Sequence, residues 1–184
     1  SRSANEHERH LRALFKRLTR FNLVVNRDKS VLASSELPFL GHVVSGDGIK
    51  PLPDSVDAID RIQPPTTVKE VKLFIGSITF YHRFLPRLLE VLRPLHLLTP
   101  GPKTKGCQKI VWGAEHQQAF ERAKNLLKTA TLLTHLASDS ELRLVTDASD
   151  IAIGAVLEQA DQTGWRPVAF FSRVLSAAEL NYSP

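Results

Sequence analysis

The sequence predicts an α+β protein, with a basic, helix-rich first half and a second half built on a sheet. Apolar residues recur at helical spacing through much of residues 1–99, whereas residues 142–172 contain three apolar runs typical of strands. Residues 1–109 carry 18 Lys and Arg against 10 Asp and Glu, and residues 110–184 carry 6 against 9. A basic surface favours a polyanionic partner and an acidic one a cation, although scattered basic residues also occur on solvated surfaces.

The first 50 residues are expected to form an amphipathic helix followed by hairpins. The pattern Ser3-Ala4-Asn5-Glu6 is a capping box, and apolar residues follow it at helical spacing. Short strand-like runs then occur at Leu23–Val25, Ser30–Leu32 and Leu37–Val44, with a turn rich in Gly and Asp before Ile49.

Residues 51–100 indicate three helices. Asp54 can cap a short one, and Thr67-Val68-Lys69-Glu70 is a capping box that opens a longer helix ending at Pro86. A third helical stretch, Leu88 to Leu98, contains Pro94 and should bend or break there. Residues 100–106, rich in Pro, Gly and Lys, form the clearest linker of the chain.

Beyond the linker we expect a short extended piece, one helix and then a sheet. The helix runs through Phe120 to Ala130, and the strands lie at about 142–146, 151–159 and 166–172. A third capping box, Ser176-Ala177-Ala178-Glu179, predicts a helix from about residue 177. Because the sequence stops soon afterwards, we expect it to be an incomplete domain.

The composition excludes several classes of protein. With 42% hydrophobic and 23% charged residues it is typical of soluble globular proteins, and no apolar stretch approaches the roughly 18 to 20 residues of a membrane span. A single cysteine, Cys107, permits no internal disulfide and, with scattered histidines, makes a structural zinc site improbable. We expect an intracellular setting, without distinguishing a cytoplasmic particle from the nucleus.

The first candidate metal ligand is Asp147. It ends a run of apolar residues, and a carboxylate there is costly to desolvate unless it binds a cation or accepts several hydrogen bonds. The alternative from this segment alone is that Asp147 and Asp150 cap a β-turn.

Motifs of one family lie along nearly the whole chain. In order they are Glu6-His7-Glu8-Arg9-His10-Leu11, Phe39-Leu40-Gly41-His42-Val43-Val44, Gly48-Ile49-Lys50-Pro51, Phe74-Ile75-Gly76, Tyr81-His82-Arg83-Phe84, Trp112 with Glu115 to Phe120, Thr146-Asp147-Ala148-Ser149-Asp150, Ile153 to Leu157, and Asn181-Tyr182-Ser183. Together they resemble the Pol polyprotein of gypsy-type retrotransposons, from the end of the reverse transcriptase palm, through thumb and connection, into RNase H.

The resemblance implies two nucleic-acid-binding elements. Phe39, Leu40 and Gly41 occupy the place of the primer grip, a hairpin that presses against the primer strand. Gly41 would permit close approach, or would merely relieve a tight β-turn. The stretch Phe74–Phe84 resembles the thumb helix that lies along the minor groove of the duplex, where the backbone at Gly76 would approach the sugars. The resemblance also implies phosphate contacts by four basic residues: Lys69, Lys72, Arg83 and Arg87. Arg83 is the strongest candidate among them.

The aromatic residues of that stretch have a different expected place. Phe74, Tyr81 and Phe84 follow helical spacing, so they are expected in the core of the thumb and not as base-stacking platforms.

Asp147 corresponds, by the resemblance, to the first carboxylate of the RNase H site. That class of enzyme hydrolyses the RNA strand of an RNA–DNA hybrid with two divalent cations, for which Mg²⁺ is the natural occupant. The resemblance favours Asp147 as a metal ligand over a turn cap, with Asp150 as a turn residue. The polymerase carboxylates and three further RNase H carboxylates fall outside this sequence, so the chain by itself is expected to be inactive.

The expected organisation has four segments. These are the palm end with a primer-grip-like hairpin (1–50), thumb helices (51–100), a linker and connection (101–141), and the N-terminal part of an RNase H-like domain (142–184). The parent would be an RNA-directed DNA polymerase with RNase H, and this part of the Pol polyprotein would bind the backbone of an RNA–DNA hybrid or primer–template duplex. Two alternatives are a domesticated, non-catalytic nucleic-acid-binding module and a structural or protein-interaction remnant.

Overall fold

The computed structural model describes residues 3–99, 106–176, 178 and 179, and the chain forms two compact units, residues 1–34 and 35–184. The first unit contains helix α1, Ala4–Arg20, whose start is capped as predicted by the Ser3 side chain, which accepts a hydrogen bond from the Glu6 N–H at 3.2 Å. The strands predicted at Leu23–Val25 and Ser30–Leu32 are wrong, because these runs form no strand. An isolated short apolar run does not become a strand without a hydrogen-bonded neighbour.

The second unit opens with a small antiparallel sheet, which confirms hairpins in this region. The prediction of Leu37–Val44 as one strand-like run is wrong, because a turn at Leu40 and Gly41 divides it into two paired strands. Its strands β1 (Glu36–Phe39), β2 (His42–Ser45) and β3 (Ile49–Pro51) pair in sequence order. Leu40 and Gly41 form the two-residue turn between β1 and β2, with φ values of 46° and 80°. Positive φ at both positions is the geometry of the tight turn that matches the twist of paired strands.

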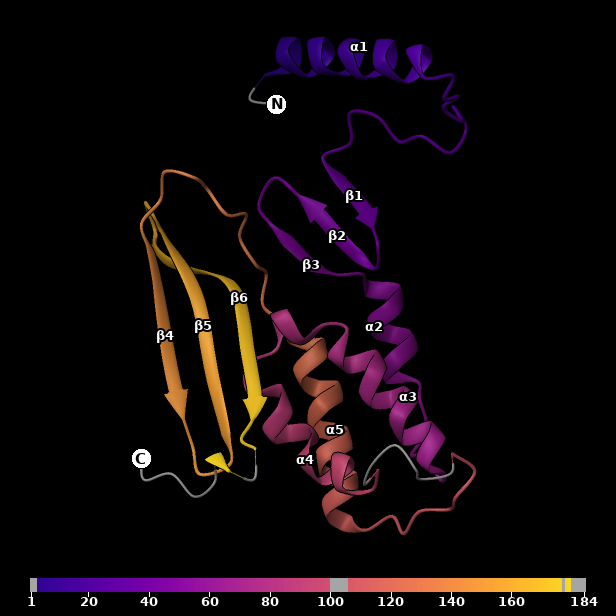
Figure 1. Cartoon of the computed structure of the whole chain (residues 1–184), viewed down its shortest axis with the longest axis vertical. Helices are drawn as coiled ribbons and strands as arrows, with labels where there is room; N and C mark the ends of the chain where they lie inside the picture. Colours follow the sequence, from indigo (N-terminus) through magenta and orange to yellow (C-terminus); the bar gives the residue numbers. More distant parts are fainter. Residues whose placement is uncertain (1–2, 100–105, 177, 180–184) are drawn as a thin grey trace. The chain divides into compact units, whose positions relative to one another are not determined.

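In the part of the chain that the structure describes, four α-helices and one short 3₁₀ helix follow (Figure 1): α2 (Pro53–Asp60), α3 (Val68–Thr79), η1 (His82–Phe84), α4 (Leu88–Leu97) and α5 (Ala114–Lys128). The capping box at the start of α3 is confirmed, since the Thr67 hydroxyl accepts from the Glu70 N–H and the Glu70 carboxylate accepts from the Thr67 N–H.

Three details of the helices differ from the prediction. The N-cap of α2 is Leu52, without a side-chain hydrogen bond, and Asp54 lies inside the first turn, where its charge favours the helix dipole. Helix α3 ends at Thr79, and η1 occupies the stretch before Pro86. Helix α4 runs through Pro94 without a break.

The helices enclose an apolar core. The rings of Phe74 and Phe120 lie 4.3 Å apart, and Tyr81 and Phe84 are also buried, so the prediction that Phe74, Tyr81 and Phe84 belong to the core is confirmed. Lys124 is buried as well, with its ammonium group donating to carbonyl oxygens at the end of α2.

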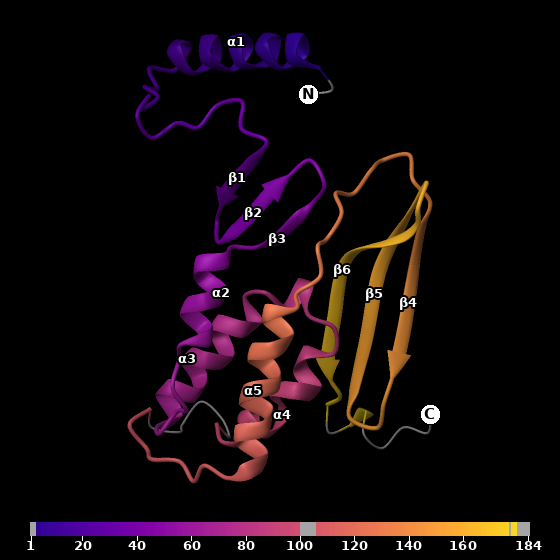
Figure 2. The ribbon, with the colours of Figure 1, turned by 180° about the vertical axis from the view of Figure 1, so that it is seen from behind.

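The second sheet contains β4 (Leu142–Ala148), β5 (Ala152–Asp161) and β6 (Gly164–Val174), in that order and antiparallel throughout. Strand β6 is the one beside the helices in both views (Figures 1 and 2), and Phe170 on β6 packs against the helical core. Strand β4 forms an edge and is exposed at every residue. Helices followed by a sheet confirm the α+β prediction.

Two predictions touch residues outside the described ranges. Most of the predicted linker, residues 100–105, and position 177 of the predicted C-terminal helix lie there. The capping pair of that helix is described: the Ser176 N–H donates to the Glu179 carboxylate at 2.8 Å, and the Glu179 N–H donates to the Ser176 hydroxyl. Among the described residues, no helix has both the length and the apolarity to cross a bilayer.

Candidate functional site

One exposed face of α3 gathers basic, apolar and glycine positions. Its residues recur every three or four positions, opposite the buried face of the helix: Lys69, Lys72, Leu73, Gly76 and Phe80. Leu73 is 61% exposed and Phe80, just past the last helical residue, is 53% exposed. Above Gly76 the space is open, because a Cβ atom built there would have no atom within 4 Å. We call these five residues the α3 face.

The β1–β2 turn packs against the end of the α3 face. The Tyr81 hydroxyl donates a hydrogen bond to the Gly41 carbonyl at 3.2 Å, and a Cβ atom at Gly41 would lie 3.1 Å from the Phe80 ring. The His42 ring stacks on Phe80 at 5.3 Å between centroids. These contacts bring the turn predicted as a primer grip next to the helix predicted as the thumb helix.

Apolar side chains at the tip of this turn point away from the core. Phe39 is 57% and Leu40 73% exposed, and Leu40 adopts a left-handed backbone that costs a residue with a side chain about 1 kcal/mol or more. The positive φ of Gly41 is enough to explain why a glycine occupies this position of the turn. Contact between Gly41 and a primer strand therefore stays a prediction.

Three of the four basic residues predicted to contact phosphate are available for binding. Lys69, Lys72 and Arg83 are exposed and form no ion pair within the described part of the chain. The nearest acidic residue along the helix, Glu70, is occupied by the capping box, and hydrogen bonds from Thr66 and then Thr67 lower the pKa of its carboxyl group. The α3 face therefore carries uncompensated positive charge.

Arg87, the fourth residue predicted to contact phosphate, has a different environment. Its guanidinium donates two hydrogen bonds to the Glu90 carboxylate, at 2.9 and 3.1 Å, and these raise the pKa of Arg87 while they lower that of Glu90. The Ser149 hydroxyl, from the turn after β4, donates to the same carboxylate at 3.1 Å. Glu90, which Arg87 holds, thus joins α4 to the segment that contains Asp147, and the charge of Asp147 also raises the pKa of Arg87.

Asp147 lies on strand β4, opposite Gly154 of β5, and its side chain is exposed. It shares with Arg87 a small hollow of about 150 Å³, lined mainly by apolar residues and backbone of the sheet. The prediction that Asp147 is near the end of the first strand of this sheet is confirmed. Asp150 lies in the bend that follows β4, as predicted.

The described residues do not fit a magnesium site by themselves. Mg²⁺ requires several oxygen ligands in octahedral geometry, and here one carboxylate faces an arginine. In residues 3–99, 106–176, 178 and 179, no three His, Cys, Asp or Glu side chains lie together as a metal site would require. Asp147 as a metal ligand stays a prediction.

Sequence reasoning missed several residues of these sites. Leu73 and Phe80 were not selected, although their spacing from Lys69 and Gly76 already placed them on the same helical face. Glu90 and Ser149 join α4 to the second sheet across 59 positions of sequence, and no local pattern indicates such a pair.

The chain matches known proteins over its whole length. Residues 112–184 match the family model of the RNase H-like domain found in reverse transcriptase. The retrovirus-related Pol polyprotein from transposon opus of Drosophila melanogaster is 38% identical over the entire chain, which covers 19% of that protein. The transposon Tf2-3 polyprotein of Schizosaccharomyces pombe is 32% identical, again over the entire chain and 13% of the relative. Over its whole length the chain is therefore similar to one segment of transposon Pol polyproteins, and residues 112–184 are similar to the RNase H-like domain found in reverse transcriptase.

Solved structures of reverse transcriptases share the fold of this segment. The foamy viral protease-reverse transcriptase dRH in complex with double-stranded DNA superposes with a TM-score of 0.86 at 28% identity, over 100% of this chain and 32% of that one. The foamy viral protease-reverse transcriptase in complex with RNA/DNA hybrid gives 0.82 at 27% identity, over 100% and 24%. The chain therefore spans less than a third of each of these relatives.

Proposed function

We propose that the α3 face and the β1–β2 turn hold the backbone of a nucleic-acid duplex, either an RNA–DNA hybrid or a primer–template. The observation that carries this proposal is the contact between the two elements, which makes one surface from parts that are 40 positions apart in the sequence. Lys69, Lys72 and Arg83 form no ion pair with any residue that the structure describes, and their positive charge suits phosphate groups.

The chemistry of this surface suits the duplex backbone more than base edges. Phosphate contacts fix the position of a protein on a duplex without reading its sequence. The centre of the α3 face offers Leu73, Phe80 and the bare backbone of Gly76, and an apolar, low surface of this kind fits the sugars lining a minor groove. The foamy viral neighbours, solved with double-stranded DNA and with RNA/DNA hybrid, support duplex binding by this chain.

A salt titration with matched variants tests the proposal. The affinity of the chain for a labelled RNA–DNA hybrid, followed by fluorescence anisotropy, should fall steeply between about 50 and 200 mM salt. Lys72→Ala and Arg83→Ala should each weaken binding and reduce the slope of log K against log salt by about 0.9 for each lost phosphate contact. Lys128→Ala is the control. Lys128 is an exposed cation on α5, away from the α3 face, and its charge is paired with Asp60 at 2.8 Å.

The same titration separates the alternatives. A non-catalytic nucleic-acid-binding module and a functional reverse transcriptase segment both bind the hybrid, whereas a structural remnant binds weakly and without dependence on Lys72 or Arg83. Wild-type affinity and salt slope in both variants would contradict duplex binding by the α3 face.

We further propose that the element is of the gypsy type and that Asp147 is one ligand of a divalent-cation site completed by carboxylates elsewhere in the polyprotein. The order of motifs along the chain and the position of Asp147 on the first strand support this. RNase H-like domains of reverse transcriptases generally use divalent metals, and Mg²⁺ is the metal we propose. In the longer polyprotein, Asp147→Asn should abolish cleavage of the hybrid and leave primer extension intact. Hybrid cleavage at the wild-type rate would refute the assignment.

A further inference from the structure

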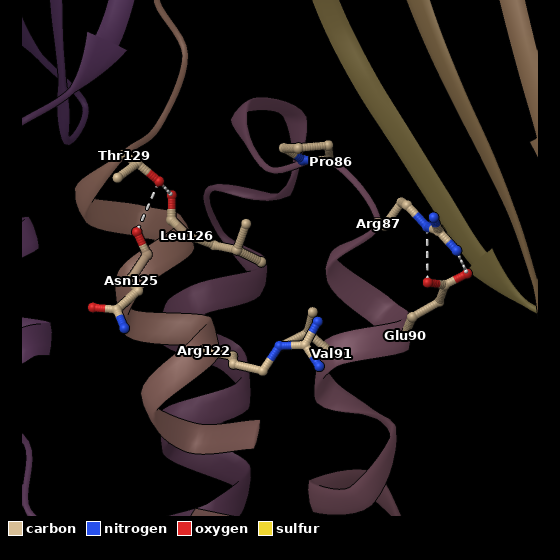
Figure 3. Close-up of a pocket in the computed structure, with 8 residues that line it drawn as sticks. All are labelled: Pro86, Arg87, Glu90, Val91, Arg122, Asn125, Leu126 and Thr129. Carbon is tan, nitrogen blue, oxygen red and sulfur yellow. Dashed lines mark hydrogen bonds and ion pairs between the residues drawn. The ribbon is translucent and has the colours of Figure 1, made fainter. Parts of the chain in front are cut away.

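A second hollow lies between α4 and α5, apart from the α3 face (Figure 3). Its volume is about 550 Å³, within the range of about 300 to 1,000 Å³ of pockets that bind small molecules. Two sets of residues line it, the first at the start of α4 and the second along one face of α5: Pro86, Arg87, Glu90 and Val91, and Arg122, Asn125, Leu126 and Thr129. None of them belongs to α3 or to the β1–β2 turn.

Arg122 is the available cation of this hollow. Its side chain extends from α5 into the gap toward α4, where Figure 3 shows it beside Val91. It is exposed and, within the part of the chain that the structure describes, forms no ion pair.

The acidic residue of the hollow is already occupied. The Glu90 carboxylate accepts two hydrogen bonds from Arg87 and one from Ser149, and Figure 3 shows Arg87 and Glu90 turned toward each other. The hydrogen bond from Arg87 lowers the pKa of Glu90 most, and the charge of Arg122 lowers it further, so Arg122 also interacts with this carboxylate. Two arginines and one glutamate line the hollow, which leaves it with a net positive charge.

The wall of the hollow is partly apolar. Pro86 and Val91 on the α4 side and Leu126 on the α5 side contribute carbon atoms to the wall, and Figure 3 shows Val91 beside Arg122. A cation beside an apolar wall suits a ligand that carries an anionic group on an apolar or aromatic body. A guanidinium binds phosphate oxygens through two parallel N–H groups, which an ammonium group does not reproduce.

We infer that the α4–α5 hollow binds a nucleotide unit, with its phosphate on Arg122 and its sugar or base against Pro86, Val91 and Leu126. Two sources can supply this unit, a nucleic-acid strand and a free mononucleotide, and they share the phosphate chemistry that Arg122 recognises. The inference does not require the α3 face to bind a duplex, since the two surfaces share no residue.

Binding measurements on the whole chain test the inference with two probes. A labelled single-stranded oligonucleotide is followed by fluorescence anisotropy, and adenosine monophosphate by the NMR shifts of methyl groups, including those of Val91 and Leu126. Arg122→Ala should weaken oligonucleotide binding about fivefold at 50 mM salt and lower the salt slope by about 0.7. Arg122→Lys should recover the salt slope and only part of the affinity. Lys128→Ala, on the same helix but paired with Asp60, should bind as the wild type does.

The outcomes separate the sources and also the two proposals. Loss of binding for both probes in Arg122→Ala shows a nucleotide site, and loss for the oligonucleotide alone shows a strand site. Unchanged affinity for both probes, or AMP-dependent shifts that spare Val91 and Leu126, overturns the inference. Because Arg122 is exposed, its variants should melt at the wild-type temperature, and a melt confirms that they are folded. If Lys72→Ala and Arg83→Ala bind the hybrid with wild-type affinity while Arg122→Ala no longer binds the oligonucleotide, duplex binding by the α3 face is refuted. The inference of a nucleotide site in the α4–α5 hollow is then supported.

Discussion

The substitution Gly76→Ala separates the stability of α3 from its proposed contact with a duplex. Gly76 lies inside the helix Val68–Thr79, and a Cβ atom there would meet nothing within 4 Å. Alanine is therefore added without a clash, and it removes the entropic cost of glycine, about 1 kcal/mol in an exposed helix interior. For a folded unit of roughly 150 to 250 residues, that gain raises Tm by about 2–4 °C.

The same methyl group should weaken binding of the hybrid. It would stand between the helix backbone and the sugars that we propose lie against Gly76, so we expect a loss of about three- to tenfold, or about 0.7–1.4 kcal/mol. The assays are a thermal melt by circular dichroism and anisotropy with a labelled RNA–DNA hybrid at one fixed salt concentration. A variant that is more stable and binds less tightly is the expected result.

A matched glycine provides the control. Gly46, in the turn between β2 and β3, is also exposed, and a Cβ atom there would likewise have nothing within 4 Å. Gly46→Ala should bind hybrid with wild-type affinity. If Gly76→Ala binds the hybrid as tightly as Gly46→Ala does, close approach of a duplex to α3 is refuted, and a lower Tm would refute the open space at this position.

Three further predictions concern stability. Lys124→Met keeps the apolar stem but removes the ammonium group that donates to two backbone carbonyls at 2.7 and 2.8 Å, so it should cost about 2 kcal/mol and lower Tm by about 4–8 °C in a thermal melt. Gly48→Ala should cost more than about 2 kcal/mol in a urea titration, because a Cβ atom would lie 2.2 Å from the Leu133 carbonyl oxygen. Glu90→Gln should lower Tm by about 1–2 °C at pH 7 and by progressively less as the pH falls below the ordinary carboxyl pKa. Hydrogen bonds from Arg87 lower the pKa of Glu90 in the folded state, so its stabilisation is present above the ordinary carboxyl pKa and is lost as the pH falls through the lowered value.

Each of these predictions has a contradicting result. A wild-type Tm for Lys124→Met would mean that the two carbonyls at the end of α2 find other donors. Gly48→Ala with an unchanged urea midpoint would contradict the close approach of Leu133 to the turn. A Tm difference between Glu90→Gln and the wild type that stays constant from pH 7 to pH 3 would show that the charge of Glu90 is not the source of the effect.

Interactions between residues close together in the sequence determine several elements of this fold. The N-cap at Ser3 and the capping boxes at Thr67 and Ser176 were predicted correctly, because a cap joins atoms three residues apart and both partners are visible in one stretch of sequence. The three strands of the second sheet follow equally local patterns, whereas the turn at Leu40 and Gly41 divides a run that was predicted as one strand.

Other assignments failed or stay open because they depend on distant partners. Leu23–Val25 has the composition of a strand but no neighbouring strand, and hydrogen bonding to a neighbour is what makes a strand. No local pattern distinguishes Lys124 from a solvated lysine, yet in the fold it is buried and donates to carbonyl oxygens 62 and 64 positions away in the sequence. The segments predicted at residues 1–50, 51–100, 101–141 and 142–184 stay predictions.

The sequence by itself determined the order of helices and strands, the buried aromatic residues of α3 and η1, and the position of Asp147 on the first strand of the second sheet, because periodicity and caps act over a few residues. The tertiary structure decided which charges are available for binding. Arg83 and Arg87 are the same residue type four positions apart, yet the first is exposed without an ion pair among the described residues and the second is held by Glu90 beside Ser149. Electrostatic interaction depends on distance in space, and the fold sets that distance.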